Sequence, residues 1–250
     1  MKKVLITGMS GLIGGLLGKH LERVGGYELS ALNRRPVEGV ECFQADISDL
    51  EAIRPAFAGQ DVVVHLAAQV QDEPWDGLVQ ANLIGVYNVY EAARQAGVRR
   101  VVFGSSGATS RGLELEAPYG AISSGREEDM PEIWPMVTAD VIRPNGTYAA
   151  SKVWGEALGR YYADYHGMSV LCVRIGSVKA DNRPSSAGER SRFLSHRDVC
   201  QVFHKCIDAP HDLKYDVFYA ASRNRWGYRD LAHPRRVLGY EPEDSAEDMD

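Results

Sequence analysis

A glycine-rich segment at residues 7–14 is the feature that most constrains how this chain can fold. It follows a short apolar run at 3–7 and precedes an amphipathic stretch that continues to about Val24. Glycines let a backbone approach a pyrophosphate closely, and a helix N-terminus offers free N–H groups and partial positive charge. This order of strand, turn and helix predicts a dinucleotide site made by Gly8, Ser10, Gly11, Leu12, Ile13 and Gly14. A glycine-rich turn without a ligand is the alternative.

Short apolar runs alternate with helical patterns over the first 175 residues. We expect strands at 3–7, 28–32, 40–45, 61–66, 101–103 and 169–175, with helices at about 49–57, 75–96 and 148–166. Because the strands are continuous apolar runs, the sheet is expected to be parallel and covered on both faces. The predicted fold class is α/β, a doubly wound parallel sheet of the Rossmann type over residues 1–175.

Two regions interrupt this alternation. Residues 113–145 carry glycine, proline and acidic residues with poor periodicity, and we interpret them as a long insertion near the site. Residues 176–250 begin polar and arginine-rich and then recover a helix at 196–206. They are expected to form a small C-terminal substrate-binding portion. The last ten residues, 241–250, are acidic and are expected to fray.

Composition narrows the class of partner. The 250 residues are 44% hydrophobic and 25% charged, as in ordinary globular proteins. A formal net charge of −6 gives no electrostatic reason to expect nucleic acid or a membrane surface as a partner, although local arginines could still bind an anionic small molecule. The four cysteines form no Cys-x-x-Cys pair, so we expect reduced thiols and no metal site. Without a signal peptide or a spanning segment, the expected location is cytoplasmic.

Residues after the second and third strands are expected to meet the adenosine end of the cofactor. Asn33, Arg34 and Arg35 stand where a carboxylate would bind the ribose hydroxyls of NAD, and the two guanidiniums suit a 2′-phosphate. The sequence therefore predicts NADP, with NAD possible and an exposed basic turn as the alternative. Asp46 could accept a hydrogen bond from the adenine amino group. Further cofactor contacts are expected from Ile47, Leu66, Ala67, Ala68, Asn82, Ser105 and Ile175.

Tyr148 and Lys152 lie four positions apart on an expected helix, so their side chains share one face. A phenol with a pKa near 10 is a poor base, and bringing that pKa to about 7 requires roughly 4 kcal/mol. An adjacent ammonium and an oxidised nicotinamide favour the phenolate. Ser106 could hydrogen-bond a substrate oxygen, with Ser105 as the competing choice. Ser106, Tyr148 and Lys152 are therefore the candidate catalytic residues.

Several motifs occur along the chain in the order typical of one enzyme family. They are the glycine motif, Asp46, His65-Leu66-Ala67-Ala68, Asn82, Ser105-Ser106 and Tyr148-x-x-x-Lys152. In these motifs the chain resembles the extended short-chain dehydrogenases/reductases, the NAD-dependent epimerase/dehydratase family. The resemblance implies that Tyr148 is the acid/base, that Lys152 binds the nicotinamide ribose and tunes Tyr148, and that Ser106 orients the substrate. We interpret His65 as structural, and Asn82 as either a cofactor contact or an interior amide.

Other segments are similar to uronate dehydrogenases and related sugar dehydrogenases, namely Pro74-Trp75, 80–85, 90–94, 174–177 and 238–242. The similarity implies oxidation of an anionic sugar at C1 to a lactone, with Arg174 binding the sugar carboxylate. A strand-end arginine paired with an acidic neighbour is the alternative for Arg174. Gly107 and Ser177 are further expected substrate contacts. Ser106 and Tyr148 are more widely separated than is usual in the family, so residues 113–145 could reshape the substrate pocket.

Two other functions are compatible with the same scaffold. A nucleotide-sugar epimerase or dehydratase uses the same three catalytic residues, but it normally has a larger C-terminal domain than the 75 residues (250 − 175) that follow Ile175 here. A non-catalytic NAD(P)-binding sensor is also possible on fold alone, although the intact catalytic residues argue against it. The helices expected at 75–96 and 148–166 could pair with their copies, as in the family's dimers, so we expect a homodimer.

Overall fold

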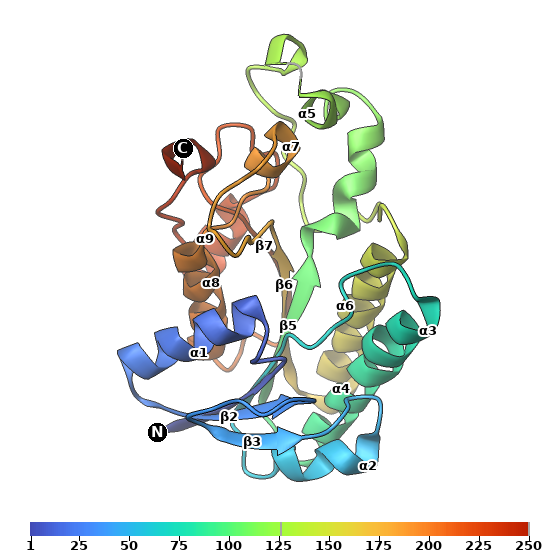
Figure 1. Cartoon of the computed structure of the whole chain (residues 1–250), viewed down its shortest axis with the longest axis vertical. Helices are drawn as coiled ribbons and strands as arrows, with labels where there is room; N and C mark the ends of the chain where they lie inside the picture. Colours follow the sequence, from blue (N-terminus) through green and yellow to red (C-terminus); the bar gives the residue numbers. More distant parts are fainter. Residues whose placement is uncertain (126, 250) are drawn as a thin grey trace.

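A seven-stranded parallel sheet forms the centre of the molecule, and its strand order is β3-β2-β1-β4-β5-β6-β7 (Figure 1). The computed structural model describes residues 1–125 and 127–249. The strands are β1 Lys2–Thr7, β2 Tyr27–Asn33, β3 Glu41–Gln44, β4 Val62–His65, β5 Arg100–Ser106, β6 Ser169–Ile175 and β7 Tyr215–Ala220. The first six follow the order 3-2-1-4-5-6 of doubly wound sheets, in which ligands bind beyond the carboxyl ends of the strands. The predicted fold class is confirmed.

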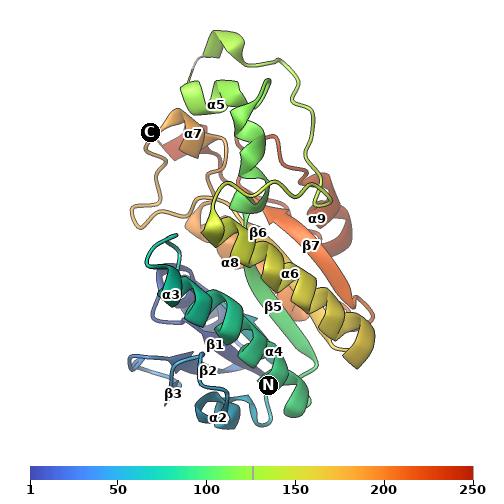
Figure 2. The ribbon, with the colours of Figure 1, turned by 90° about the vertical axis from the view of Figure 1, so that its right-hand side faces the viewer.

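Helices cover both faces of the sheet (Figures 1 and 2). The main helices are α1 Leu12–Val24, α2 Leu50–Ile53, α3 Trp75–Leu78, α4 Gly85–Gln95, α5 Gly120–Ser124, α6 Thr147–His166, α7 Ala187–Arg190, α8 His196–Asp208 and α9 Ala232–Leu238. The 3₁₀ helices are η1 Arg54–Phe57, η3 Gly107–Leu115, η4 Glu127–Asp129 and η5 Ala246–Met249, and η2 Val79–Ile84 is π-helical. Helices α1, α8 and α9 lie on one face, and α2, α4 and α6 lie on the other. The helix expected at 75–96 is continuous from α3 through η2 to α4.

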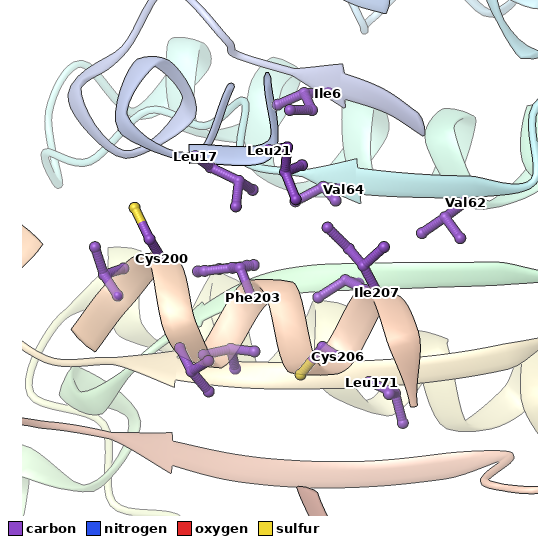
Figure 3. Packing of buried hydrophobic residues seen from close by; sticks show 14 of the residues in the cluster. Ile6, Leu17, Leu21, Val62, Val64, Leu171, Cys200, Phe203, Cys206 and Ile207 are labelled. Carbon is purple, nitrogen blue, oxygen red and sulfur yellow. The ribbon is translucent and has the colours of Figure 1, made fainter. Parts of the chain in front are cut away.

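The core beneath α1 and α8 shows why both helices form (Figure 3). Leu17 and Leu21, four positions apart on α1, point toward Phe203 and Ile207, four positions apart on α8, and all four are fully buried with Val64 of β4. Apolar residues at this spacing form one face of a helix. Each such side chain contributes about 1.5–3 kcal/mol when it leaves water.

The C-terminal quarter of the chain completes the sheet. Strand β7 pairs in parallel with β6 from Val170–Tyr215 to Ile175–Ala220, and α8 packs against α1. The division expected at residue 175 therefore does not separate two structural units. Strand β7 was not expected, although residues 217–221 form a short apolar run.

Residues 113–125 and 127–145 form a cap at the carboxyl end of the sheet, where α5 and α7 lie together (Figures 1 and 2). Trp134 and Val137 pack with Tyr219 and Tyr228 in a small cluster of their own. The Val137 N–H donates to the Tyr228 carbonyl at 2.8 Å, and the Asp230 N–H donates to the Val137 carbonyl at 3.0 Å. The insertion is thus tied to the segment that follows β7.

The acidic C-terminal segment is held in place up to residue 249, so the expected fraying is wrong. The N–H groups of Glu243 and Asp244 donate to the Asp198 carboxylate at 2.8 and 3.2 Å. Tyr240 and Ala246 are fully buried. These contacts anchor the segment to the start of α8.

The four cysteines are free, and Cys42 is the one that is not buried. In residues 1–125 and 127–249, no helix combines the length and apolar character needed to cross a membrane. The same described residues contain no group of three or more His, Cys, Asp or Glu side chains arranged to hold a metal ion.

Candidate active site

The turn between β1 and α1 is shaped to accept a pyrophosphate. Gly8 has a φ of +72°, and a Cβ there would lie 2.7 Å from the backbone N of Ala67. A Cβ at Gly14 would lie 2.6 Å from the Gly8 carbonyl oxygen, so the two segments pack backbone to backbone. Gly11 is the N-cap of α1, no side chain caps this helix, and Ser10, Gly11 and Leu12 are exposed. An uncapped helix N-terminus beside a tight glycine turn fits the phosphates of a dinucleotide.

The ends of β2 and β3 bring together the residues predicted for the adenosine end. Arg34 and Arg35 are exposed, and an Arg34 Nη1 lies 3.9 Å from the Asp46 carboxylate. The Ser48 backbone N–H and hydroxyl donate to that carboxylate at 3.0 and 2.8 Å and hold the pKa of Asp46 below its usual range. Asn33 is 5% exposed, and its Nδ2 has no partner among the described residues. An unpartnered donor beside two guanidiniums suits an anionic or hydroxyl-bearing ligand.

Ile47, which follows Asp46 at the predicted adenosine end of the site, is buried. Its carbonyl accepts a hydrogen bond from the Asn88 amide at 2.9 Å. Its side chain lies against Gly85, where a Cβ would come within 2.6 Å.

Thr7 holds the loop that follows β4. Its hydroxyl oxygen accepts the N–H groups of Leu66 and Ala67 at 3.2 and 3.1 Å and lies 2.7 Å from His65 Nδ1. Because two N–H groups already donate to this oxygen, the Thr7 proton is directed at Nδ1, which places the imidazole proton on Nε2. Burial lowers the pKa of His65 to about 3, so the ring is neutral and structural. Leu66, Ala67 and Ala68 remain partly exposed at the edge of the sheet.

The three candidate catalytic side chains meet at the carboxyl end of β5. Ser106, at the end of β5, faces Tyr148 and lowers the pKa of its phenol. Lys152 Nζ donates to the Gly104 carbonyl at 2.8 Å and lies 5.6 Å from the centre of the Tyr148 ring. Lys152 is 4% exposed and also sits 5.0 Å from the centre of the Phe103 ring. Lys152 and Tyr148 are thus held close together at the end of β5.

Burial governs the proton affinities of this pair. Burial raises the pKa of Tyr148, and the hydrogen bond from Ser106 partly offsets that rise. Burial also lowers the pKa of Lys152 to about 8, although the charge of Glu156 raises it. At neutral pH Lys152 therefore keeps its proton and Tyr148 remains a phenol until further positive charge arrives.

Asp72 caps the N-terminus of α6, the helix that carries Tyr148 and Lys152. The sequence interpretation did not single out Asp72. Its carboxylate accepts the Tyr148 N–H at 2.6 Å and the Thr147 hydroxyl at 2.7 Å. These bonds, the first of them above all, lower the pKa of Asp72. The N-cap residue itself is Gly146, which has no side chain to use, and a Cβ there would lie 3.0 Å from the Asp72 carboxylate. A glycine where a capping side chain is usual was the available signal.

Asn82 does not face the cofactor. It is fully buried, and its amide bonds the Gln69 N–H at 2.9 Å, the Gln69 carbonyl at 2.8 Å and the Ser151 hydroxyl at 3.0 Å. The interior-amide alternative describes this residue, which joins the loop after β4 to α6.

Arg174 and Ser105 are also turned away from the substrate side. Arg174 is 1% exposed, and its Nε and Nη2 donate to the two Glu156 oxygens at 2.9 and 2.8 Å. Its Nη1 donates to the Val141 carbonyl at 3.1 Å and the Tyr219 hydroxyl at 3.0 Å. The Ser105 hydroxyl donates to Glu156 at 2.5 Å. A buried guanidinium with these partners cannot receive a sugar carboxylate, so the acidic-neighbour alternative describes Arg174.

Arg229 lies beside Gly107, one of the expected substrate contacts, and the sequence interpretation did not single it out. A Cβ on Gly107 would lie 3.2 Å from Arg229 Nε and 3.4 Å from the Ile175 carbonyl oxygen. Arg229 is 3% exposed, and its Nη2 donates to the Tyr228 hydroxyl at 3.0 Å. Its Nε and Nη1 have no partner among the described residues. Arg229 follows β7, outside every motif of the sequence, so no local signal pointed to it.

Ser177 lies beside this region, just after β6. Its N–H donates to the Arg192 carbonyl at 2.6 Å, and its carbonyl accepts the Leu194 N–H at 2.9 Å. Its side chain is partly exposed and remains available to a ligand.

A groove of about 1210 Å³ lies elsewhere, between α1 and α8, and its lining includes His20, Arg23 and His204. None of the predicted cofactor, substrate or catalytic residues lines it. The candidate active site is therefore identified from the predicted residues that lie together, and it does not coincide with this groove.

Comparisons with known proteins show the family of the chain. The model of the NAD dependent epimerase/dehydratase family matches residues 4–198. The NAD-dependent glucose-6-phosphate dehydrogenase of Haloferax volcanii is 33% identical over 97% of this chain and 94% of the relative. The uronate dehydrogenase of Agrobacterium fabrum is 34% identical over 99% of this chain and 86% of the relative.

Solved structures give the same result. The crystal structure of uronate dehydrogenase from Agrobacterium tumefaciens matches with a TM-score of 0.83 at 33% identity, over 99% of this chain and 86% of that one. A mutant of that enzyme complexed with NAD matches with a TM-score of 0.81 at 32% identity, over 99% of this chain and 87% of that one. The family model covers most of the chain and the relatives cover nearly all of it, so the chain belongs to the NAD-dependent epimerase/dehydratase family.

Proposed function

We propose that this chain is an NAD(P)-dependent dehydrogenase that oxidises the C1 hydroxyl of a sugar or sugar acid to a lactone. The observation that carries the proposal is the convergence of Ser106, Tyr148 and Lys152 at the edge of the sheet that also holds the glycine turn. The names of the relatives, which are sugar and sugar-acid dehydrogenases, support the same reaction class.

The side chains of the site divide the work of an alcohol oxidation. A bound dinucleotide would supply the oxidised nicotinamide that accepts the hydride from C1. The Ser106 hydroxyl holds the substrate oxygen, and Tyr148 Oη, as phenolate, takes the hydroxyl proton as the C=O bond forms. The Lys152 ammonium, anchored on the Gly104 carbonyl, stabilises that phenolate and directs its remaining N–H groups toward the cofactor ribose.

The end of β2 favours NADP, with NAD also accepted. The residues there are Asn33, Arg34 and Arg35, and no carboxylate stands among them to bind a ribose diol. The guanidiniums of Arg34 and Arg35 are exposed, with Arg34 at 3.9 Å from the Asp46 carboxylate, and such groups form charge-assisted bonds with a 2′-phosphate.

The substrate carries an anionic group, and Arg229 is the residue that receives it. The unpartnered Nε of Arg229 lies beside Gly107, next to Ser106, and Nη1 is the second open donor of the same guanidinium. The pKa of Arg192 is lowered by burial and by the charges of Arg111 and Arg229, and it is raised by the charges of Glu114 and Glu189. An anionic group of the substrate would satisfy the open donors of Arg229.

The chain forms a homodimer through α4 and α6. Tyr87 of α4 and Trp154, Tyr161 and Tyr165 of α6 are 43–77% exposed. Large aromatic side chains that gather on two adjacent helices are typical of a protein interface.

The test follows the absorbance of reduced nicotinamide while the purified protein meets NAD or NADP with aldoses, sugar phosphates and uronates. We expect turnover on an anionic sugar and its loss in Tyr148→Phe, which removes the proton acceptor and keeps the ring. Cofactor binding without net reduction on any of these substrates would contradict the dehydrogenase and favour an epimerase or a sensor.

A further inference from the structure

Three consecutive residues at the end of β5 each hold one side chain of α6. The pairs are Ser106 with Tyr148, Gly104 with Lys152 and Ser105 with Glu156. The three helical residues are spaced by four, so they form a single row on the face of α6 that meets the sheet. Two members of the row are the candidate catalytic pair, and the third has no role in the reaction described above.

Glu156 joins three elements of the site at one carboxylate. It is 4% exposed, and it accepts the Ser105 hydroxyl of β5 at 2.5 Å and two guanidinium bonds from Arg174 of β6 at 2.8 and 2.9 Å. Ser105 and Arg174 are direct neighbours in the β5–β6 pairing. A two-pronged guanidinium bond fixes orientation as well as distance. The carboxylate therefore fixes both the position of α6 along its axis and its rotation relative to the end of β5.

The charge of Glu156 also acts on Lys152, one helical turn away. Burial lowers the pKa of Lys152 to about 8, and Glu156 is the group that opposes this effect. The other groups around the pair are neutral at working pH or already paired. Those beside Lys152 are His65 on β4 and Tyr148 on α6. Those around Glu156 are Arg174 and Cys172 on β6, Tyr215 on β7 and Tyr90 on α4. Within the described part of the chain, no second carboxylate contributes to the charge at Lys152.

We propose that Glu156 is a positioning residue of the catalytic centre, which aligns the Tyr148–Lys152 row with β5 and holds a negative charge one helical turn from the Lys152 ammonium. The proposal rests on the dehydrogenase function in so far as that row acts on substrate. The Glu156–Arg174 pair then positions the catalytic side chains and does not bind the sugar.

The test separates the charge of Glu156 from its shape. Glu156→Gln keeps the length and one acceptor oxygen but removes the negative charge, and it leaves Arg174 uncompensated. We expect kcat at pH 7.5 to fall about tenfold with the substrate KM within about twofold, and the midpoint at which Lys152 loses its proton to move down by about one pH unit. Glu156→Asp keeps the charge on a shorter side chain, so kcat should fall while the midpoint stays at its wild-type value.

Glu91→Gln is the matched control. Glu91 on α4 also anchors α6, because it accepts the Tyr162 hydroxyl at 3.1 Å, and it pairs with Arg94. It does not contribute to the charge at Lys152. Glu91→Gln should therefore lower stability without moving the midpoint.

A second readout works without turnover. Binding of NADPH, followed by its fluorescence between pH 6 and 9, reports the charge of Lys152 through the nicotinamide ribose. We expect the binding midpoint of Glu156→Gln to move as the kinetic one does. If the wild-type protein turns over no sugar, the proposed function fails and this titration alone decides the role of Glu156. A Glu156→Gln midpoint within about 0.3 pH unit of wild type would overturn the proposal.

Discussion

Asp72 and Tyr148 are joined by a hydrogen bond across 76 positions, from the Tyr148 backbone N–H to the Asp72 carboxylate at 2.6 Å. The cap of the catalytic helix thus comes from the loop after β4, the same loop whose first residues border the cofactor edge. The start of α6, and with it the direction of the Tyr148 phenol, depends on that loop.

Replacing Asp72 should therefore lower catalysis as well as stability. In Asp72→Ala the Tyr148 N–H and the Thr147 hydroxyl lose their acceptor, and we expect kcat to fall severalfold. Asp72→Asn keeps an acceptor oxygen and should recover most of the loss. The pKa of Asp72 is lowered in the folded protein, so its contribution is present above the ordinary carboxyl pKa and disappears as the pH falls through the lowered value.

Asp49 offers the control, because its carboxylate caps α2 by accepting the Ala52 N–H at 3.1 Å, far from the catalytic residues. Thermal unfolding and steady-state kinetics are measured on both alanine variants. Equal losses of kcat in Asp49→Ala and Asp72→Ala would show that the Asp72 cap has no special effect on Tyr148.

Cofactor choice should respond to Arg34 and Arg35. Replacing both by serine removes the charge-assisted donors offered to a 2′-phosphate, each worth about 1.5–3 kcal/mol. We expect the KM for NADP to rise at least tenfold and the KM for NAD to change little. Arg54→Ser is the control, since Arg54 of η1 is a surface arginine paired with Glu51 of α2. A double variant that still prefers NADP as the wild type does would contradict the assignment.

The sequence predicted the fold well because most strands carry their own signal. Continuous apolar runs and a glycine turn are local features, and they indicate a parallel, doubly wound sheet without any knowledge of contacts. Strand β7 was missed although residues 217–221 are a short apolar run, which by itself does not distinguish a strand from other buried segments. The ordered C-terminal segment was missed because its partner, Asp198, lies more than forty positions away.

The site shows the same division between local and distant information. The sequence predicted that Ser106, Tyr148 and Lys152 lie together because their spacing places them at a strand end and on one helix face. The burial of Arg174 was not predicted because the partners of a guanidinium are not visible in sequence. Arg174 forms a buried ion pair with Glu156 of α6, which the sequence does not reveal. Arg229 lies in a segment without any motif, and two of its donor nitrogens have no partner among the described residues.

Arg229 should discriminate anionic from neutral sugars. Arg229→Gln removes the charge beside Gly107, and we expect the KM for a uronate or sugar phosphate to rise at least tenfold, because a charge-assisted bond contributes about 1.5–3 kcal/mol. The KM for a neutral aldose, where one is used, should change by less than about threefold. Arg225→Gln is the control, because Arg225 is exposed and stacks over Trp226 in the same loop. Parallel changes in KM for charged and neutral sugars would contradict the role of Arg229.

His65 should make the folded protein sensitive to mild acid. Burial lowers its pKa from 6.5 to about 3. The unfolded chain therefore takes up a proton below pH 6.5 that the folded protein refuses until about pH 3, and stability is lost as the pH falls through this window. Between pH 7.5 and pH 5 this one group should remove about 2 kcal/mol from the free energy of unfolding. Urea unfolding at the two pH values measures the loss, and His65→Gln should reduce it by that amount whatever its own stability. His166→Gln replaces an exposed histidine and should keep the wild-type pH dependence. If His65→Gln loses as much stability as the wild type over this interval, the acid sensitivity lies in other groups.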